Sequence, residues 1–128
     1  MRSYDVAISS LAIDAPRRWT DNLLSQYALP DVNSERRGVA RRISYPALVR
    51  LALIRQLHTR LGIGVGNSIR IASELLDANV ECVHESGHLT LSVDRPALER
   101  TLDAALAEAL ESAPALRRGR PPKKTPRT

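Results

Sequence analysis

The sequence predicts a mainly α-helical protein with a small β-hairpin. Apolar residues recur at helical spacing along most of the chain, whereas they alternate with polar residues over residues 79–94. The chain has 128 residues, 43% of them hydrophobic, which suffices for one core but not for a two-domain enzyme. A single cysteine excludes an intrachain disulfide, and no apolar run approaches the roughly 18 residues of a transmembrane helix.

The N-terminal segment predicts two short helices separated by a break. Apolar residues over 5–13 share one helical face, with Asp5 as the N-cap, although the β-branched residues there also allow a strand. Pro16 ends a short interruption and suits the first position of a second helix over 16–27. One face of the second helix carries Trp19, Leu23 and Tyr27.

The middle of the chain predicts a loop followed by two longer helices. Residues 28–43 are rich in turn-forming residues and in arginine, which indicates a loop or an open hairpin. Ser44 and Pro46 are typical of a helix start and Gly62 of a helix end, so a helix is expected between them. A further helix is expected near 67–77.

The C-terminal part predicts a hairpin, a last helix and an unfolded tail. Two alternating runs over 79–94 flank Ser86-Gly87, a pair typical of a tight turn. The last helix is expected over 96–113. Residues 114–128 contain four of the eight prolines and six cations, with too little apolar content to fold. The sequence therefore divides into segments 1–78, 79–113 and 114–128.

The net charge of +5 is unevenly distributed along the chain. Residues 1–60 contain ten arginines and five acidic residues, whereas residues 61–116 contain three arginines and nine acidic residues. Residues 117–128 contain four arginines and both lysines of the protein, without an acidic residue. A basic half, an acidic segment and a basic tail suggest a polyanionic partner that is contacted from two places.

Four short stretches carry a family signal. They are Ala15–Trp19 at the first break, Ala40–Ser44 at the end of the arginine-rich loop, Leu48–Leu57, and Ile69–Leu76. In this order they resemble the turn with the start of the recognition helix, the wing end and the two following helices of the MerR-type regulators. The resemblance covers about residues 4–78 and rests on order and spacing more than on identities. The sequence departs from the family pattern at Ile13-Asp14, at Asp21-Asn22 in place of an aromatic pair, and at Ile43.

The resemblance implies a winged helix-turn-helix that binds double-stranded DNA by sequence. The physical chemistry points the same way, because arginines in the first turn of a helix add cations to an end that already carries free N–H groups. A helix in the major groove reads base edges, and arginine pairs with guanine there. The expected contacts of this helix are Arg17, Arg18, Thr20, Asp21 and Asn22. The loop arginines Arg36, Arg37, Arg41 and Arg42 are expected to meet mostly phosphates.

The basic tail predicts a second contact with DNA. Its run Arg118-Gly119-Arg120-Pro121 resembles an AT-hook, an extended segment that lies in the narrow minor groove of A·T-rich DNA. Lys123 and Lys124 add positive charge behind this run. Non-specific binding to phosphates is the other use open to the tail.

The last helix has two interpretations. Its apolar stripe closes the core of the domain, or it pairs with the same helix of a second copy. We favour a homodimer in which this helix is the dimerisation helix, since small DNA-binding domains gain affinity by dimerising. The stripe consists of Leu98, Leu102, Ala105, Leu106 and Ala109.

Other chemistry has little support in the sequence. Cys82, His84 and His88 lack a fourth ligand, so no metal site is expected. The glycines of 62–66 lack the lysine of a phosphate-binding loop, and the chain holds no catalytic constellation. We therefore expect no enzyme, no cofactor and no small-molecule effector. Without an export signal, a cytoplasmic, nucleoid-associated location is expected, with no membrane partner.

The sequence thus favours a small bacterial transcriptional regulator or DNA-architectural protein. The alternative is a protein-interaction adaptor, similar to an antitoxin, whose hairpin and last helix bind a partner protein. Binding to duplex DNA distinguishes the two.

Overall fold

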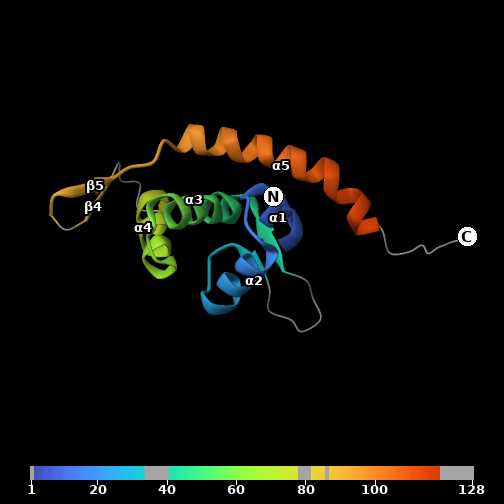
Figure 1. Cartoon of the computed structure of the whole chain (residues 1–128), viewed down its shortest axis with the longest axis horizontal. Coiled ribbons are helices and arrows are strands. Elements are labelled where there is room, and N and C mark those ends of the chain that lie inside the picture. The colour runs from blue at the N-terminus through green and yellow to red at the C-terminus, as the bar shows by residue number, and fades with distance from the viewer. Residues whose placement is uncertain (1, 34–40, 78–81, 86, 119–128) are drawn as a thin grey trace, which may run out of the picture.

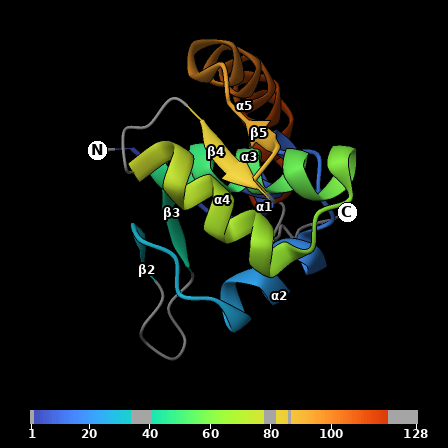
Figure 2. The same ribbon diagram turned by 90° about the vertical axis from the view of Figure 1, so that its left-hand side faces the viewer.

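The structure confirms the mainly α-helical class with a small β-hairpin. The computed structural model describes residues 2–33, 41–77, 82–85 and 87–118, which contain five helices and two small antiparallel sheets. Helices α1 (Val6–Ala12) and α3 (Tyr45–Leu61) lie at the centre (Figure 1). Helix α5 (Arg95–Arg118) covers them on one side, and α2 (Arg17–Gln26) lies on the other. Helix α4 (Val65–Asp77) packs against α3 (Figure 2).

The segment 5–13, whose sequence allows a helix or a strand, forms the helix α1. Asp5 is the N-cap of α1, and its carboxylate accepts a hydrogen bond of 2.8 Å from the amide of Ile8. Asp14 follows α1 with a positive φ of 56°, so the chain turns sharply there. Pro16 is the N-cap of α2, which begins one residue later than expected.

The arginine-rich loop belongs to a three-stranded antiparallel sheet. Its strands are β1 (Ser3–Tyr4), β2 (Val32–Asn33) and β3 (Arg42–Ser44), in the order β1-β3-β2. Ile43 on the central strand is opposite both Tyr4 and Val32, and its side chain is fully buried. Strands β2 and β3 pair as the base of the hairpin expected within 28–43. Residues 34–40 lie outside the described part of the chain.

Helix α3 begins and ends where its sequence predicts. The hydroxyl of Ser44 accepts a hydrogen bond of 3.3 Å from the amide of Ala47, which caps the first turn. Gly62 ends the helix in a left-handed conformation with φ of 71°. A residue with a side chain would be strained in this conformation, whereas glycine is not. All residues from 47 to 54 are buried, so α3 is the central element of the core.

A buried arginine fastens α4 to α3. Arg50 is only 7% exposed, and its guanidinium lies 2.6 Å from the carboxylate of Asp77 and donates to the hydroxyl of Ser73 at 3.1 Å. The hydrogen bond from Arg50 holds the pKa of Asp77 below its ordinary value. Because one buried charge meets two partners on α4, this contact fixes how the two helices lie against each other.

Helix α5 closes the core of its own chain, which corrects the assignment of its apolar stripe to a dimer interface. Leu102, Leu106 and Ala109 are buried where α5 packs on α1 and α3, and Leu98 and Ala105 are partly buried. The predicted dimerisation stripe is therefore used within one copy. The hydroxyl of Tyr45 on α3 also donates a hydrogen bond of 2.7 Å to the carboxylate of Asp103 on α5. Partial burial and this bond raise the pKa of Tyr45 well above its ordinary value.

The last helix is longer than its sequence pattern predicts. It runs to Arg118, so the expectation that 114–118 belong to an unfolded tail is wrong. Residues 115–118 are Ala, Leu, Arg and Arg, all strong helix formers, and they carry the helix past Pro114. Residues 119–128 lie outside the described chain. Within the described ranges, no helix combines the length and apolar character needed to cross a bilayer.

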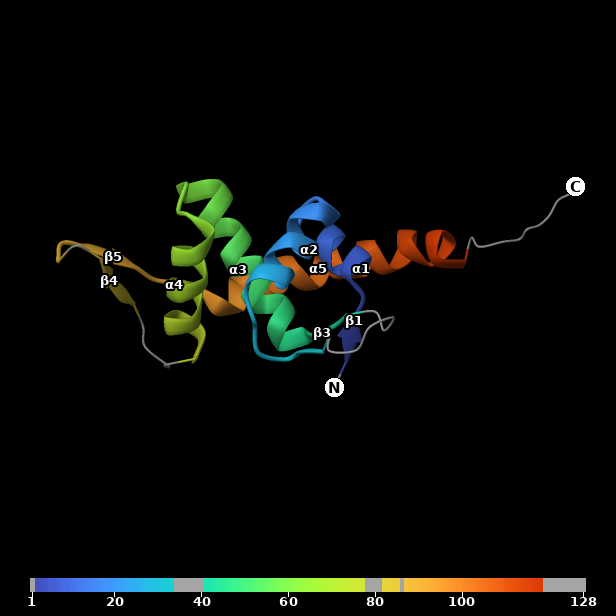
Figure 3. The ribbon, with the colours of Figure 1, turned by 90° about the horizontal axis from the view of Figure 1, so that it is seen from below.

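The second sheet is a short hairpin that projects from the body. Strands β4 (Val83–Glu85) and β5 (Leu89–Leu91) pair antiparallel, with Val83 opposite Leu91 and Glu85 opposite Leu89. Gly87 lies in the connection with φ of 76°. Pairing covers less of 79–94 than the alternation predicts. Figures 1 and 3 show the hairpin extending beyond α4, away from the helices that form the core.

Candidate nucleic-acid interface

The outer face of α2 is polar, exposed and basic. Arg17 and Arg18 occupy its first turn, and Asn22 lies one turn further along; all three side chains are exposed. The N-cap is Pro16, which provides no side-chain acceptor for the first amides of α2. The end of this helix therefore presents two guanidinium groups together with free N–H groups, as an anion-binding helix end does.

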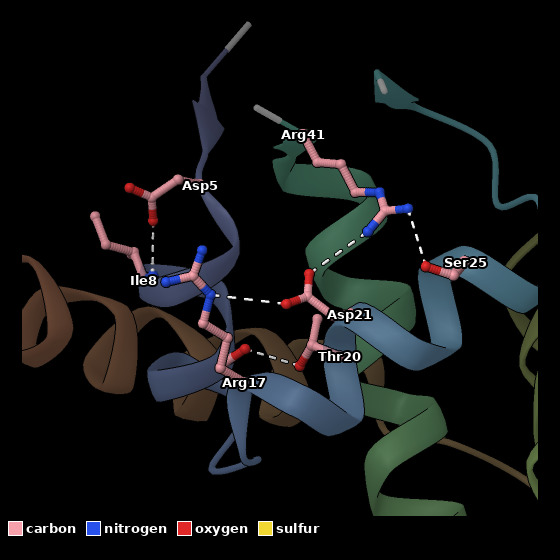
Figure 4. A network of polar contacts seen from close by, with 8 residues as sticks. Asp5, Ile8, Arg17, Thr20, Asp21, Ser25 and Arg41 are labelled. Carbon is pink, nitrogen blue, oxygen red and sulfur yellow. Dashed lines mark hydrogen bonds and ion pairs between the residues drawn. The ribbon is translucent and has the colours of Figure 1, made fainter. Parts of the chain in front are cut away.

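Two arginines from different elements meet at one carboxylate on this face. Figure 4 shows Asp21 between Arg17, one turn back on α2, and Arg41, the residue before β3. The ion pair with Arg17 measures 3.7 Å and that with Arg41 measures 3.5 Å, each to a different carboxylate oxygen. Arg41 also donates a hydrogen bond of 3.1 Å to the hydroxyl of Ser25. The end of the arginine-rich loop is thereby tied to α2.

Arg42 extends the basic surface along β3. Its guanidinium donates to the hydroxyl and to the carbonyl oxygen of Ser3 on β1, at 3.2 and 2.7 Å. The side chain is nevertheless exposed, because neighbouring residues of a strand point to opposite faces and Ile43 takes the buried face. The guanidinium groups of Arg41 and Arg42 are thus both held in place by contacts within the protein.

Thr20 is not part of this surface, which corrects its prediction as a DNA contact. Its side chain is 0% exposed, and its hydroxyl accepts a hydrogen bond of 2.8 Å from the hydroxyl of Ser10 on α1. A residue enclosed between two helices does not reach a ligand outside. Its role is structural, because the pair satisfies two buried hydroxyls where α1 meets α2.

An aromatic contact fixes α2 against α3. The guanidinium of Arg55 lies 4.8 Å from the ring centroid of Trp19, and His58 stacks on the same indole at 6.1 Å. Arg55 also donates to the carbonyl oxygen of Asp14 at 3.2 Å. These contacts hold the start of α2 in place from the side opposite its exposed arginines.

The sequence predictions left out some residues of the site. Ser25 follows Arg17 and Asp21 at helical spacing, so the periodicity of α2 contains its signal. Arg55 has no such local signal, because its aromatic partner is distant in the sequence. Arg36, Arg37, Gly119, Arg120, Pro121, Lys123 and Lys124 lie outside the described residues. Arg118 ends α5, and its side chain is likewise outside the description.

The comparisons with known proteins return no match: no family model fits the chain, and no curated protein resembles it significantly. Among the residues described, no group of histidine, cysteine and carboxylate side chains could hold a metal ion. The site is therefore interpreted from its own chemistry, which is that of an exposed cationic surface built on a helix and a strand.

Proposed function

We propose that the protein binds double-stranded DNA as a small transcriptional regulator or DNA-architectural protein of the bacterial nucleoid. The observation that carries the proposal is the convergence of Arg17 on α2 and Arg41, the residue just before β3, beside exposed Arg18 and Asn22. A helix and a strand that present cations on one surface match the shape and charge of a DNA groove with its two phosphate backbones.

The order of the elements supports a winged helix-turn-helix. Helices α1 and α2 are joined by a short turn, and the base of the β2–β3 hairpin follows α2 in the chain. In this proposal α2 is the recognition helix, and the hairpin that begins with β2 and ends with β3 is the wing. This is the order of elements that the MerR-type resemblance implies.

Each side chain has a separate task in the proposed complex. Arg17 and Arg18 approach guanine, whose O6 and N7 accept two parallel hydrogen bonds from one guanidinium. Asn22 is suited to adenine for the same geometric reason. Arg41 and Arg42 meet phosphates, which orient the protein on the duplex without reading its sequence. The positions of α2 and β3 then fix the register of the contacts.

Replacement of both helix arginines tests the proposal. The variant Arg17→Ala/Arg18→Ala is expected to lose affinity for a site selected from random DNA by at least about tenfold, since one bidentate contact contributes about 1–3 kcal/mol. Arg70→Ala is the matched control, because Arg70 on α4 also pairs with a carboxylate at i+4, Glu74. Mobility shifts at two salt concentrations provide the measurement. Absence of duplex binding by the unaltered protein at low salt would overturn the proposal.

The tail adds affinity in this proposal. Deletion of 119–128 removes two arginines and both lysines, so it is expected to weaken binding to all sequences and to flatten the salt dependence. If the run from Arg118 to Pro121 inserts into the minor groove, the loss is larger on A·T-rich duplexes than on G·C-rich ones. An equal loss of affinity on both kinds of duplex indicates that the tail contacts only phosphates.

The second copy, in this proposal, uses the outer face of α5. Arg100, Ala104, Ala107 and Glu111 are all exposed, and their spacing puts them on one helical face opposite the buried stripe. The intervals between these four positions read the same in both directions along the helix. Antiparallel pairing about a two-fold axis therefore sets Arg100 of one copy opposite Glu111 of the other, and Ala104 opposite Ala107. The alanines permit close approach, and the charges at the two ends are complementary.

Charge reversal tests this dimer. Arg100→Glu and Glu111→Arg are each expected to give a monomer, because each sets two like charges opposite one another, while the double variant restores the dimer. Arg95→Glu is the control, since Arg95 pairs with Glu99 on its own helix. Size-exclusion chromatography with light scattering gives the mass. A monomeric unaltered protein, or a double variant that stays monomeric, would contradict this arrangement.

The adaptor alternative has one observation in its favour. A groove of about 530 Å³ lies between α1 and α5, lined by apolar Leu11, Ala105 and Ala109 and by polar Glu108, Glu111 and Ser112. The side chain of Leu11 is 51% exposed there, which is typical of a surface that meets an apolar segment of another protein. Failure to bind any duplex at low salt would favour this alternative over DNA binding.

A further inference from the structure

The carboxylate of Asp21 is an unexpected group on a surface proposed to meet DNA. Phosphates repel it, and it occupies two arginines that could otherwise bind them. The two ion pairs measure 3.5 and 3.7 Å, and the side chains of Arg17 and Asp21 are 68% and 42% exposed. The pair with Arg17 is long and accessible, so it stabilises the fold by little. The Arg41 side chain is 27% exposed, and its pair ties the end of the arginine-rich loop to α2, which does not require that the same carboxylate also occupy Arg17.

The chemistry of the three groups suggests a role in selection. While Asp21 pairs with Arg17 and Arg41, neither guanidinium is fully available to a phosphate of arbitrary sequence. A base edge that donates a hydrogen bond to Asp21 can take the place of the arginines. Cytosine N4 is such a donor in the major groove, and the guanine paired with it accepts from arginine. A C·G pair can thus engage Asp21 and a released arginine together.

We infer that Asp21 is a specificity-determining residue, which lowers binding to arbitrary DNA and favours duplex sites with a C·G pair opposite α2. The inference rests on the proposed function and adds the base pair that the site prefers. Arg41, just before β3, contributes because Ser25 and Asp21 both hold it against α2. Release of its ion pair frees a guanidinium outside α2, whereas release of the Arg17 pair frees one within the helix.

The variant Asp21→Asn tests the inference, since the amide keeps the size of the carboxylate and removes its charge. Affinity for random-sequence duplex is expected to rise about tenfold. The slope of log K against log salt should steepen by about one to two, because each added phosphate contact contributes about −0.9. Discrimination between a selected site and random DNA should fall by at least about tenfold. The control Glu74→Gln removes the carboxylate that pairs with Arg70 on α4 and should change none of these quantities.

A second variant separates charge from geometry. Asp21→Glu keeps the charge on a longer side chain, so it should retain the weak binding and shallow salt slope on random DNA while losing discrimination. If Asp21→Asn binds random DNA with unchanged affinity and slope, or loses affinity for every sequence, the inference is overturned and the proposed function stands. If neither the unaltered protein nor Asp21→Asn binds duplex DNA at low salt, both the proposed function and the inference fail.

Discussion

The guanidinium of Arg50 on α3 lies 2.6 Å from the carboxylate of Asp77 on α4. The two residues differ in their surroundings, because the Arg50 side chain is 8% exposed and that of Asp77 is 53% exposed. The arginine is therefore the partner that depends on the pair, since a buried cation without its counter-ion is costly while an exposed carboxylate returns to water. Loss of the Asp77 carboxylate therefore destabilises the fold mainly by leaving the buried Arg50 without its counter-ion.

Removal of the carboxylate is expected to make stability less dependent on pH. The pKa of Asp77 is lowered in the folded state from its ordinary 3.8, so the ionised carboxylate contributes stability above about pH 4. That contribution is lost as the pH falls through the lowered folded-state value. Asp77→Asn should therefore be less stable than the unaltered protein at pH 7, by about 1–3 kcal/mol, and the difference should shrink in acid. Urea unfolding across pH measures it, and a difference that is constant across pH contradicts the assignment.

Replacement of Thr20 is expected to affect folding and not DNA contact. Thr20→Val leaves the buried hydroxyl of Ser10 without its acceptor, which should cost about 1–3 kcal/mol. The double variant Ser10→Ala/Thr20→Val removes both hydroxyls and should recover part of that loss. Thermal and denaturant unfolding give the energies. A loss of DNA affinity in fully folded Thr20→Val would show that the side chain reaches the ligand after all.

Truncation of Leu106 tests whether α5 belongs to the core. Leu106→Ala is expected to cost about 2–5 kcal/mol, because the side chain is 3% exposed among residues of α1 and α3. Leu110→Ala, on the same helix but 39% exposed, is the control and should cost much less. The oligomeric state of folded Leu106→Ala should be unchanged. A dissociated but equally stable protein would restore the interpretation of this stripe as a dimer interface.

Loss of the Tyr45 hydroxyl is expected to loosen α5. Tyr45→Phe removes the hydrogen bond to Asp103 and should cost about 0.5–1.5 kcal/mol. Amide exchange should become faster in α5 near Asp103 and stay unchanged in α4, because only the former helix is held by this bond. Asp103→Asn retains an acceptor and should have the smaller effect.

Local signals in the sequence sufficed for several elements. Ser44 and Gly62 cap α3 as predicted, because a hydroxyl acceptor and a left-handed glycine act within a few residues. Asp5 likewise caps α1. These helix ends depend on residues close in the sequence, so they could be predicted without the tertiary structure.

Contacts between distant residues could not be predicted in this way. Thr20 is polar and follows Arg17 and Arg18 by a few residues, so its sequence suggests a ligand contact; Ser10, which satisfies its hydroxyl, belongs to another helix. The stripe of Leu102 and Leu106 has the same ambiguity, because periodicity identifies an apolar face but not what covers it. The end of α5 differs again, since the composition of 114–128 suggested an unfolded tail, whereas its first residues continue the helix to Arg118.

The position of Trp19 gives the protein an optical reporter. It is the chain's one tryptophan, and its indole contacts Arg55 and His58 of α3, where the start of α2 meets that helix. A ligand that binds the exposed face of α2 and shifts the helix changes the surroundings of this ring without touching it. Intrinsic fluorescence can therefore follow occupancy of the site in solution, in label-free protein, and a variant of Arg55 calibrates the signal.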